Sequence, residues 1–171
     1  MSNVEIERKF LVVSDAWRAE HTKAAPIRQA YVAVTEKLNV RVRRYGRDAF
    51  LTVKGKATGI TRKEIETAVP AEFVEAILAE GLFGGQPVEK TRYLVPHKGF
   101  TFEVDEFEGA NAGLVVAEIE LEAEEAEFPR PPWLGEEVTA DQRYSNSYLA
   151  SNPYSGWGLP VQAPGGEVGD Q

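Results

Sequence analysis

The sequence contains no cysteine and only two histidines, His21 and His97. Disulfides, thiolate nucleophiles, zinc fingers and iron–sulfur clusters are therefore excluded, and a histidine-rich metal site is not expected. A metal bound by this chain would be held mainly by oxygen, the donor atom that suits Mg²⁺, Mn²⁺ and Ca²⁺. A GxSxG motif is also missing, and nothing else favours a Ser-His-Asp mechanism.

Long apolar runs are missing as well. The apolar stretches are too short to cross a bilayer, and the N-terminal sequence is charged from Glu5 onward, where a signal peptide would need an apolar stretch. We therefore expect a cytoplasmic protein that does not associate with a membrane.

Positive charge is in the minority, because 19 lysines and arginines face 27 acidic residues, for a net charge of −8. This balance argues against a protein that coats a nucleic-acid polymer. Anion binding would have to depend on cationic residues that are concentrated locally. The length of 171 residues and the hydrophobic content of 43% allow one domain with a substantial core.

The hydrophobic pattern predicts an α+β fold. Strands are expected at about 4–13, 27–35, 38–45, 49–55, 61–68, 87–95, 100–107 and 114–122. Most connections are short, so neighbouring strands should be antiparallel. Helices are expected over 15–22 after Ser14, over 71–80 between Pro70 and Gly81, and over 140–149 after Thr139. Residues 1–150 are interpreted as one domain, and residues 151–171, rich in glycine and proline, as a mobile tail.

Charged side chains recur two residues apart on nearly every predicted strand, and residues i and i+2 of a strand point to the same face. The sets are Glu5, Glu7 and Lys9; Arg41 and Arg43; Lys54 with Lys56 just beyond it; Arg62, Glu64 and Glu66; Lys90 and Arg92; Glu103 and Asp105; and Glu118 and Glu120. Taken singly, such a pair usually marks the solvated face of a half-exposed sheet.

Two features argue against a solvated face here. The opposite faces of the same strands are apolar, as at Val40 and Val42, and the segments 15–22 and 71–80 could cover them. The charge sets are also sorted by sign, some cationic and others anionic, whereas a solvated surface normally mixes both signs. We therefore predict a closed eight-stranded antiparallel β-barrel, with a charged lumen and helices packed on the outside.

A charged lumen restricts what the protein can bind. The inward-facing cations and anions are roughly equal in number, and each would cost several kcal/mol if it were buried dry and unpaired. A polyanion that enters together with divalent cations would keep this balance, and a triphosphate with one or two Mg²⁺ ions satisfies that condition. Phosphoryl transfer requires little from a protein beyond positioning and electrostatic stabilisation.

The ordered series of motifs resembles the CYTH, or triphosphate tunnel metalloenzyme, superfamily over roughly residues 3–150. The first strand carries the ExExK pattern from Glu5 to Lys9. The series continues through RVR at 41–43, LTVKGK at 51–56, TRKEIE at 61–66, EKTRY at 89–93, FEVDEF at 102–107, AEIELE at 117–122 and EVTADQRYSNSYLA at 137–150. ExExK alone would be a weak signal, whereas the ordered series is strong. The form of the first strand and the short chain look most like the bacterial inorganic triphosphatases.

This resemblance implies a role for each group of charged residues. The metal ligands would be Glu5, Glu7, Glu118 and Glu120, with Mg²⁺ or Mn²⁺ as the cofactor. The substrate-binding residues would be Lys9, Arg41, Arg43, Lys54, Lys56, Arg62, Lys90 and Arg92. The other acids of the lumen would be Glu64, Glu66, Glu103 and Asp105. In the bacterial enzymes the lysine of the first strand partners a tyrosine of the second, which makes Lys9 and Tyr31 the catalytic candidates.

The function predicted in this way is metal-dependent hydrolysis of a triphosphate, with inorganic triphosphate giving pyrophosphate and phosphate. A class IV-type adenylate cyclase, a nucleoside or thiamine triphosphatase, and a non-catalytic module that binds polyphosphate or a nucleotide are the alternatives. The expected partner is a small polyphosphate rather than a nucleic-acid polymer, and a homodimer is a possible assembly.

The remaining features have plainer interpretations. Trp17 and Trp133 are interpreted as packing residues. In the last predicted helix, Arg143, Asp141 or one of the serines is expected to point into one mouth of the barrel.

Overall fold

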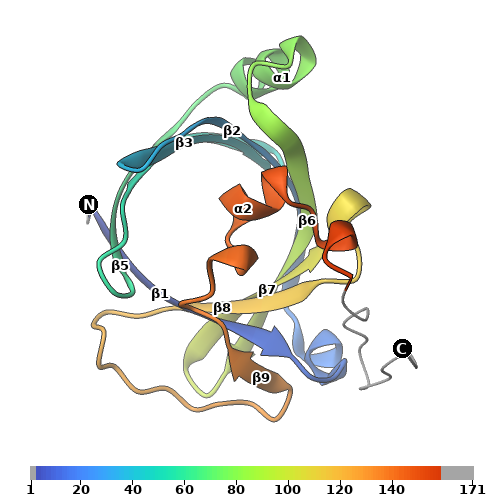
Figure 1. The fold of residues 1–171 in the computed structure, drawn as a ribbon. Coiled ribbons are helices and arrows are strands. Elements are labelled where there is room, and N and C mark those ends of the chain that lie inside the picture. Colours follow the sequence, from blue (N-terminus) through green and yellow to red (C-terminus); the bar gives the residue numbers. More distant parts are fainter. Residues whose placement is uncertain (1–2, 159–171) are drawn as a thin grey trace.

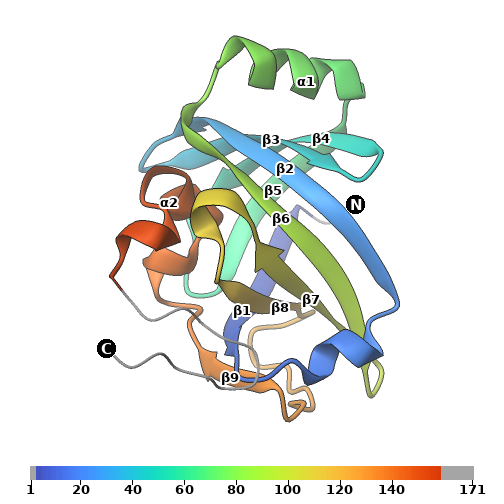
Figure 2. The same ribbon diagram turned by 90° about the vertical axis from the view of Figure 1, so that its right-hand side faces the viewer.

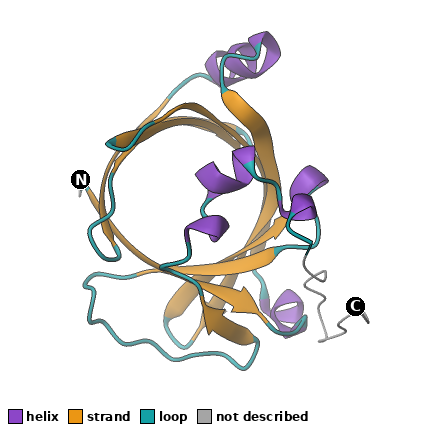
Figure 3. Ribbon diagram, viewed as in Figure 1, coloured by secondary structure: helices purple, strands orange, loops and turns teal. Residues whose placement is uncertain are grey.

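The computed structural model, which describes residues 3–158, contains an antiparallel sheet that closes on itself (Figure 1). Its strands are β1 (Val4–Val12), β2 (Lys23–Val34), β3 (Leu38–Tyr45), β4 (Asp48–Gly55), β5 (Thr61–Ala68), β6 (Gly84–His97), β7 (Phe100–Phe107), β8 (Val115–Glu120) and β9 (Leu134–Glu137). The strand order is β5-β4-β3-β2-β6-β7-β8-β1, and pairing of β1 with β5 closes a barrel of eight strands. The predicted fold class is confirmed, and strands form the whole wall of the barrel (Figure 3).

The strand β9 was not predicted. Residues Val4–Ile6 of β1 pair with β5, and the other end of β1, at Phe10 and Val12, pairs with β9 along the same edge. Gly135 allows this approach, because a Cβ atom there would lie 2.6 Å from Val13 Cγ1 and 3.0 Å from the Leu11 carbonyl oxygen. The four residues of β9 show no alternating pattern, so the strand depends on the edge that β1 offers.

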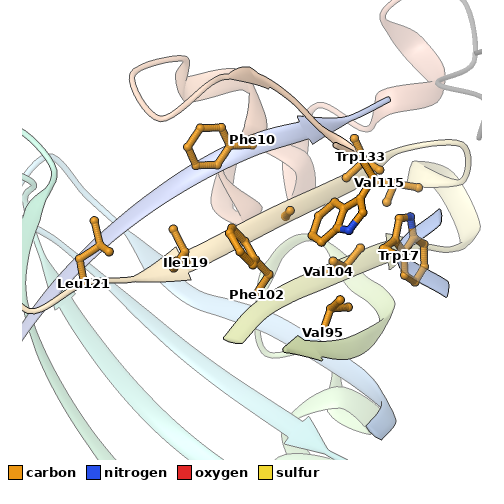
Figure 4. Close-up of a cluster of buried hydrophobic side chains, with 11 residues drawn as sticks. Phe10, Trp17, Val95, Phe102, Val104, Val115, Ile119, Leu121 and Trp133 are labelled. Carbon is orange, nitrogen blue, oxygen red and sulfur yellow. The ribbon is translucent and has the colours of Figure 1, made fainter. Parts of the chain in front are cut away.

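A hydrophobic core covers the outside of the barrel wall (Figure 4). Phe10, Phe102 and Ile119 alternate along their strands with inward-facing charges and are therefore turned outward. Trp17 and Trp133 pack over them and are fully buried, with the rings of Trp133 and Phe102 5.4 Å apart in a T-shaped contact. The interpretation of both tryptophans as packing residues is confirmed.

A second outer core lies under the helix α1 (Ala71–Glu80), whose bounds match the prediction. Val74 and Leu78 pack against Val42 of β3 and its neighbours Ala30 and Ala49. The helix ends at Gly81, whose positive φ of 68° lets its N–H reach the carbonyls at the end of the helix. The other predicted outer helix, over 15–22, is instead a short 3₁₀ helix, η1 (Ala16–Glu20).

A third core fills one end of the barrel from inside. Leu11, Tyr31, Val88, Phe107 and Val116 continue the inward-facing rows of charged residues, but they are apolar. The C-terminal segment packs against them, and α2 (Asn146–Ser151) appears inside the ring of strands in Figure 1 and toward one end of the barrel in Figure 2. The lumen is therefore closed by hydrophobic packing at that end.

The expected continuous helix over 140–149 is wrong. The chain forms the 3₁₀ helix η3 (Gln142–Tyr144) and then α2, which begins after Ser145, whose Oγ accepts a hydrogen bond from the Tyr148 N–H. The short helices η2 (Gly109–Asn111) and η4 (Tyr154–Gly156) complete the described chain, in which no helix has the length and apolar character needed to cross a membrane.

Part of the segment expected to be a mobile tail packs against the barrel. Tyr154 is 9% exposed, and its ring lies 5.1 Å from that of Trp157, so the chain is folded at least that far. Residues 159–171 of that segment lie outside the described residues. The division into 1–150 and 151–171 stays a prediction.

Candidate active site

A cavity of about 540 Å³ occupies the lumen of the barrel. Strand alternation brings the charged side chains of β1 and β3 to β8 to it, together with the buried Tyr31 of β2. The charged residues that these strands contribute are Glu5, Glu7, Lys9, Arg41, Arg43, Lys54, Arg62, Glu64, Glu66, Lys90, Arg92, Glu103, Glu118 and Glu120. The structure thus brings together most of the residues that the sequence singled out, while their individual roles stay predictions.

Two of the predicted lumen residues do not line this cavity. Lys56 is exposed, because β4 ends at Gly55 and the alternation that turns Lys54 inward does not continue. Its expected position in the lumen is wrong. Asp105 faces inward but lies behind the lining, where it is 1% exposed between Lys90 and Arg92.

Three carboxylates meet on one side of the lumen. Glu7, Glu103 and Glu118 each offer an oxygen atom, and these atoms lie within 4.8 Å of one another. Burial raises the pKa of Glu7 well above its usual value, and the charges of Glu118 and Glu5 raise it further. Burial also raises the pKa of Glu103. Closely spaced carboxylate oxygens are the donors that hard divalent cations prefer, so this group fits such an ion.

The carboxylate group differs from the ligand set that the resemblance implied. Glu103 was assigned only to the other lumen acids, yet it lies directly opposite Glu118 in the β7–β8 register. Glu5 instead accepts hydrogen bonds from Lys54 Nζ at 3.1 and 3.3 Å. Glu120 lines the cavity, but among the described residues it is not one of the three carboxylates that lie close together. The pairing of β7 with β8, which the sequence does not specify, is what identifies Glu103 as a member of the carboxylate group.

Arg92 connects the carboxylate group with the cationic part of the lumen. Its guanidinium forms a two-point interaction with Asp105, at 2.8 and 2.9 Å, and a third hydrogen bond to Glu118 Oε1 at 3.1 Å. Burial alone would raise the pKa of Asp105, but Arg92 and Lys90 hold it below its usual value. Burial would likewise raise the pKa of Glu118, and Lys9 and Arg92 lower it instead. These charges are therefore fixed in place before any ligand arrives.

The positive charges of Arg41 and Arg43 are balanced by fewer carboxylates than that of Arg92. Both lie 3.6 Å from the same oxygen of Glu66, which also accepts a hydrogen bond from the Thr52 hydroxyl. Burial, together with the neighbouring cations Arg41 and Arg92, lowers the pKa of Arg43 to about 10. Two buried guanidinium groups that share one carboxylate leave an excess of positive charge, which suits an anionic ligand.

The two lysines near the closed end of the lumen hold the C-terminal segment. Lys9 Nζ donates to the Tyr144 carbonyl oxygen at 2.9 Å and lies 3.5 Å from Glu118. Lys90 Nζ lies 2.7 Å from Asp105 and donates to Asn146 Oδ1 at 3.0 Å. Burial lowers the pKa of Lys90 to about 8, although Asp105 opposes this shift.

The partnership expected between Lys9 and Tyr31 takes a different form. The Lys9 ammonium contacts the backbone of Tyr144 rather than the Tyr31 hydroxyl, and no hydrogen bond joins Lys9 to Tyr31 within residues 3–158. Both residues nevertheless line the same cavity.

The C-terminal residues that line the cavity include Asp141, Ser145, Asn146 and Ser147. Arg143 is exposed and donates a hydrogen bond to Asp141 at 2.7 Å, so its expected inward position is wrong. The alternative, that Asp141 and the serines point inward, is correct, and they line the cavity at the end that the C-terminal segment closes. Sequence reasoning missed Asn146, because no strand alternation applies to this segment.

Comparison with known proteins agrees with this geometry. The model of the CYTH domain family matches residues 3–150. The inorganic triphosphatase of Acetivibrio thermocellus is 48% identical over 150 residues, which cover 88% of this chain and 95% of that protein. The inorganic triphosphatase of Nitrosomonas europaea is 40% identical over 151 residues, covering 85% and 96%. The crystal structure of the inorganic triphosphatase NE1496 superposes with a TM-score of 0.61 at 37% identity, covering 85% of this chain and 93% of that one.

Proposed function

The chain belongs to the CYTH domain family, and on that premise we propose that it hydrolyses a triphosphate with the help of a divalent cation. One observation carries the proposal: the carboxylate group of Glu7, Glu103 and Glu118 and a set of buried cations face the same cavity. Two relatives named inorganic triphosphatase, at 48% and 40% identity, support inorganic triphosphate as the substrate.

Binding of the substrate depends on the cations of the lumen. Arg41, Arg43 and Arg92 carry planar guanidinium groups that can each bind two phosphate oxygens, whereas lysine binds as a point charge. The remaining cations in this role are Lys9, Lys54, Arg62 and Lys90, all of which line the cavity. Their positive charge offsets the negative charge that spreads over the phosphate oxygens in the transition state.

Glu7, Glu103 and Glu118 would hold the divalent cation, with Glu5 and Glu120 close by on the same strands. When bound, such a cation neutralises phosphate charge and lowers the pKa of coordinated water. We propose Mg²⁺ or Mn²⁺ as this ion, since both prefer carboxylate oxygen donors.

Lys9 and Tyr31 are proposed to orient the attacking water. Its oxygen forms a bond to the terminal phosphorus while the bridging P–O bond breaks, so phosphate and pyrophosphate leave and the water protons pass to these products and to solvent. Lys9 is held at the Tyr144 carbonyl and beside Glu118, which keeps its ammonium group at the cavity wall.

The choice of an inorganic substrate over a nucleotide rests on the aromatic residues of the cavity. Tyr31 and Tyr45 are the aromatic side chains among the residues that line it. The Arg43 guanidinium lies 5.4 Å from the Tyr45 ring centroid and that of Arg92 lies 5.9 Å from it. Two cations therefore already cover the ring that could stack on a base.

Phosphate release from inorganic triphosphate tests this function. We expect turnover with Mg²⁺ or Mn²⁺, none in excess EDTA, and a loss of about 100-fold or more in kcat for Glu118→Gln. Glu125→Gln, at an exposed acid of a surface loop, is the matched control and should match the wild type. Absence of turnover with either ion would contradict the proposal, and cyclic AMP formed from ATP would favour the adenylate cyclase alternative.

A further inference from the structure

The closed end of the lumen carries a side-chain amide whose orientation can be assigned. Asn146 Oδ1 accepts a hydrogen bond from Lys90 Nζ at 3.0 Å and another from Gln29 Nε2 at 3.1 Å. An ammonium group can only donate, so the amide atom that faces Lys90 must be the oxygen. The usual ambiguity between the oxygen and nitrogen of an asparagine amide is therefore resolved here by the chemistry of its neighbour.

Both groups that hold this oxygen are buried. Gln29 is fully buried and Lys90 is 2% exposed, and Lys90 is held in turn by Asp105 at 2.7 Å. Asp105 accepts the two-point interaction from Arg92, which reaches Glu118. A continuous chain of hydrogen bonds thus runs from Asn146 to the carboxylate group.

The amide nitrogen of Asn146 faces a different environment from the oxygen. Within residues 3–158 this nitrogen donates to no protein acceptor. The nitrogen is also not fully enclosed by protein, so it remains accessible. Asn146 lines the cavity. Because the oxygen is turned toward Lys90 and Gln29, the two N–H donors of the amide are left for the lumen.

Lys90 has the complementary arrangement. An ammonium group has three N–H donors, and Asp105 and Asn146 engage two of them. The third donor and the Asn146 amide N–H belong to neighbouring groups at the closed end, where the Lys90 ammonium also lies 5.3 Å from the Phe107 ring centroid. A phosphate oxygen is an acceptor that can take both, and hydrogen bonds to an ionised acceptor are stronger than neutral ones.

We propose that Asn146 is a further substrate-binding residue, which donates its amide N–H to an oxygen of the phosphate that lies deepest in the lumen. This inference rests on the proposed function. The apolar residues Val88, Phe107 and Val116 lie beyond this point and offer no donor to a further phosphate. The phosphate at Asn146 is consequently a terminal one, and the substrate enters from the opposite, open end with a free phosphate first.

The substitutions Asn146→Asp and Asn146→Ala separate this role from a purely structural one. Aspartate keeps an oxygen acceptor for Lys90 but replaces the N–H donors with a negatively charged oxygen that repels phosphate. Alanine removes both. If Asn146 binds the substrate, the dissociation constant for inorganic triphosphate rises about 10- to 100-fold for alanine and still more for aspartate.

The dissociation constants are measured by calorimetry with inorganic triphosphate in EDTA, so that hydrolysis does not interfere. Ser151→Ala, at an exposed residue of α2, is the control and should bind as the wild type does. Thermal unfolding of every variant checks that the C-terminal segment remains folded. The opposite order, in which aspartate binds like the wild type and alanine does not, would show that Asn146 only orients Lys90 and would overturn the inference.

A second measurement keeps the inference testable if the aspartate variant fails to fold. Asn146→Ala is made in a Lys90→Met background, and triphosphate binding is compared with that of Lys90→Met alone. If Asn146 contacts the substrate directly, the double variant binds triphosphate at least about fivefold more weakly than Lys90→Met alone. If Asn146 acts only through Lys90, the two variants bind equally, and that result would overturn the inference. A wild-type protein that bound no triphosphate would refute the proposed function and this inference together.

Discussion

At the scale of single residues, Asp105 determines where two cations of the lumen lie. It contacts both Lys90 and Arg92 and is 1% exposed, so both positive charges depend on one enclosed carboxylate. Such a group contributes more through the arrangement that it imposes than through the net energy of the ion pairs, because desolvation offsets much of their attraction.

We expect Asp105→Asn to lower the free energy of unfolding by about 3–5 kcal/mol, since it leaves two buried cations short of one negative charge. Urea unfolding followed by fluorescence measures this loss. Glu125→Gln, which removes an exposed charge, should change stability by less than about 0.5 kcal/mol. An equally small effect of Asp105→Asn would mean that the buried pairs contribute little.

The Tyr31 hydroxyl provides a second prediction at this scale. Its ring packs in the core that closes the barrel, so Tyr31→Phe keeps the packing and removes only the hydroxyl group from the cavity. If Tyr31 orients the attacking water, kcat falls about 10- to 100-fold at an unchanged melting temperature. Steady-state kinetics with inorganic triphosphate measure this, and a kcat within about twofold of the wild type would remove Tyr31 from the mechanism.

At the scale of elements, the position of α2 depends on a glycine of β6. Gly85 has a φ of 65°, and a Cβ atom there would lie 2.4 Å from the Ala150 carbonyl oxygen. The strand and the helix are therefore packed backbone against backbone. Because α2 begins with Asn146, which lines the cavity, this contact also determines where the closed end of the cavity lies.

Gly85→Ala should destabilise the protein by about 1–3 kcal/mol and weaken triphosphate binding, because α2 must shift to make room. Gly84→Ala is the matched control, since a Cβ atom at that neighbour would meet nothing within 4 Å and its φ is not positive. Thermal unfolding and calorimetry on the two variants give the comparison. Equal effects of both substitutions would show that the approach of α2 is not tight.

The 3₁₀ helix η1 is joined to the barrel by an ion pair. Arg18 donates two hydrogen bonds to Glu106 of β7, at 3.1 and 2.6 Å, and these bonds hold the pKa of Glu106 below its usual value. A carboxyl group with a lowered pKa in the folded state stabilises the protein above its unfolded-state pKa, and this stabilisation disappears as the pH falls through the folded-state pKa.

Glu106→Gln should therefore cost stability at neutral pH and nothing at a pH below the folded-state pKa of Glu106. The side chain is 36% exposed, so solvent screening limits the loss to less than about 1 kcal/mol. Urea unfolding of both proteins between neutral and strongly acidic pH measures the difference. A constant difference across that range would contradict the electrostatic origin.

At the scale of the whole molecule, the lumen collects charge from strands that are distant in the sequence. β1 closes the barrel against β5 and β8, which places Glu5 opposite Arg62 and Lys9 opposite Glu118. A ligand that contacts several of these strands at once is bound only by the closed barrel, so its binding energy adds to the stability of the fold.

Inorganic triphosphate at about 100 times its dissociation constant should accordingly raise the free energy of unfolding by about 2.7 kcal/mol, even without a divalent cation. Thermal unfolding with and without triphosphate in EDTA tests this. Arg41→Gln should reduce the shift by weakening binding. A ligand-induced shift that this substitution left unchanged would place triphosphate outside the lumen.

Strand alternation is a local property, and for this reason the sequence predicts most of the residues that face the lumen. Glu5, Glu7 and Lys9 share a face whatever their neighbours are, and the apolar residues between them indicate which face is packed from outside. The bounds of α1 are local for the same reason, with Pro70 before the helix and Gly81 after it. The charged lumen and the helix over it therefore follow from the order of the residues.

Which of these charges meet depends on how the strands pack in three dimensions. The proximity of Glu103 to Glu7 and Glu118 depends on strand register. The exposure of Lys56 depends on where β4 ends, and the place of Asn146 depends on how the C-terminal segment enters the barrel. These are contacts between segments far apart in the chain, and no repeat within a segment specifies their geometry. The order of the residues thus specifies a barrel lined with charge, whereas its closed end and the grouping of its carboxylates arise from the packing of distant strands and of α2.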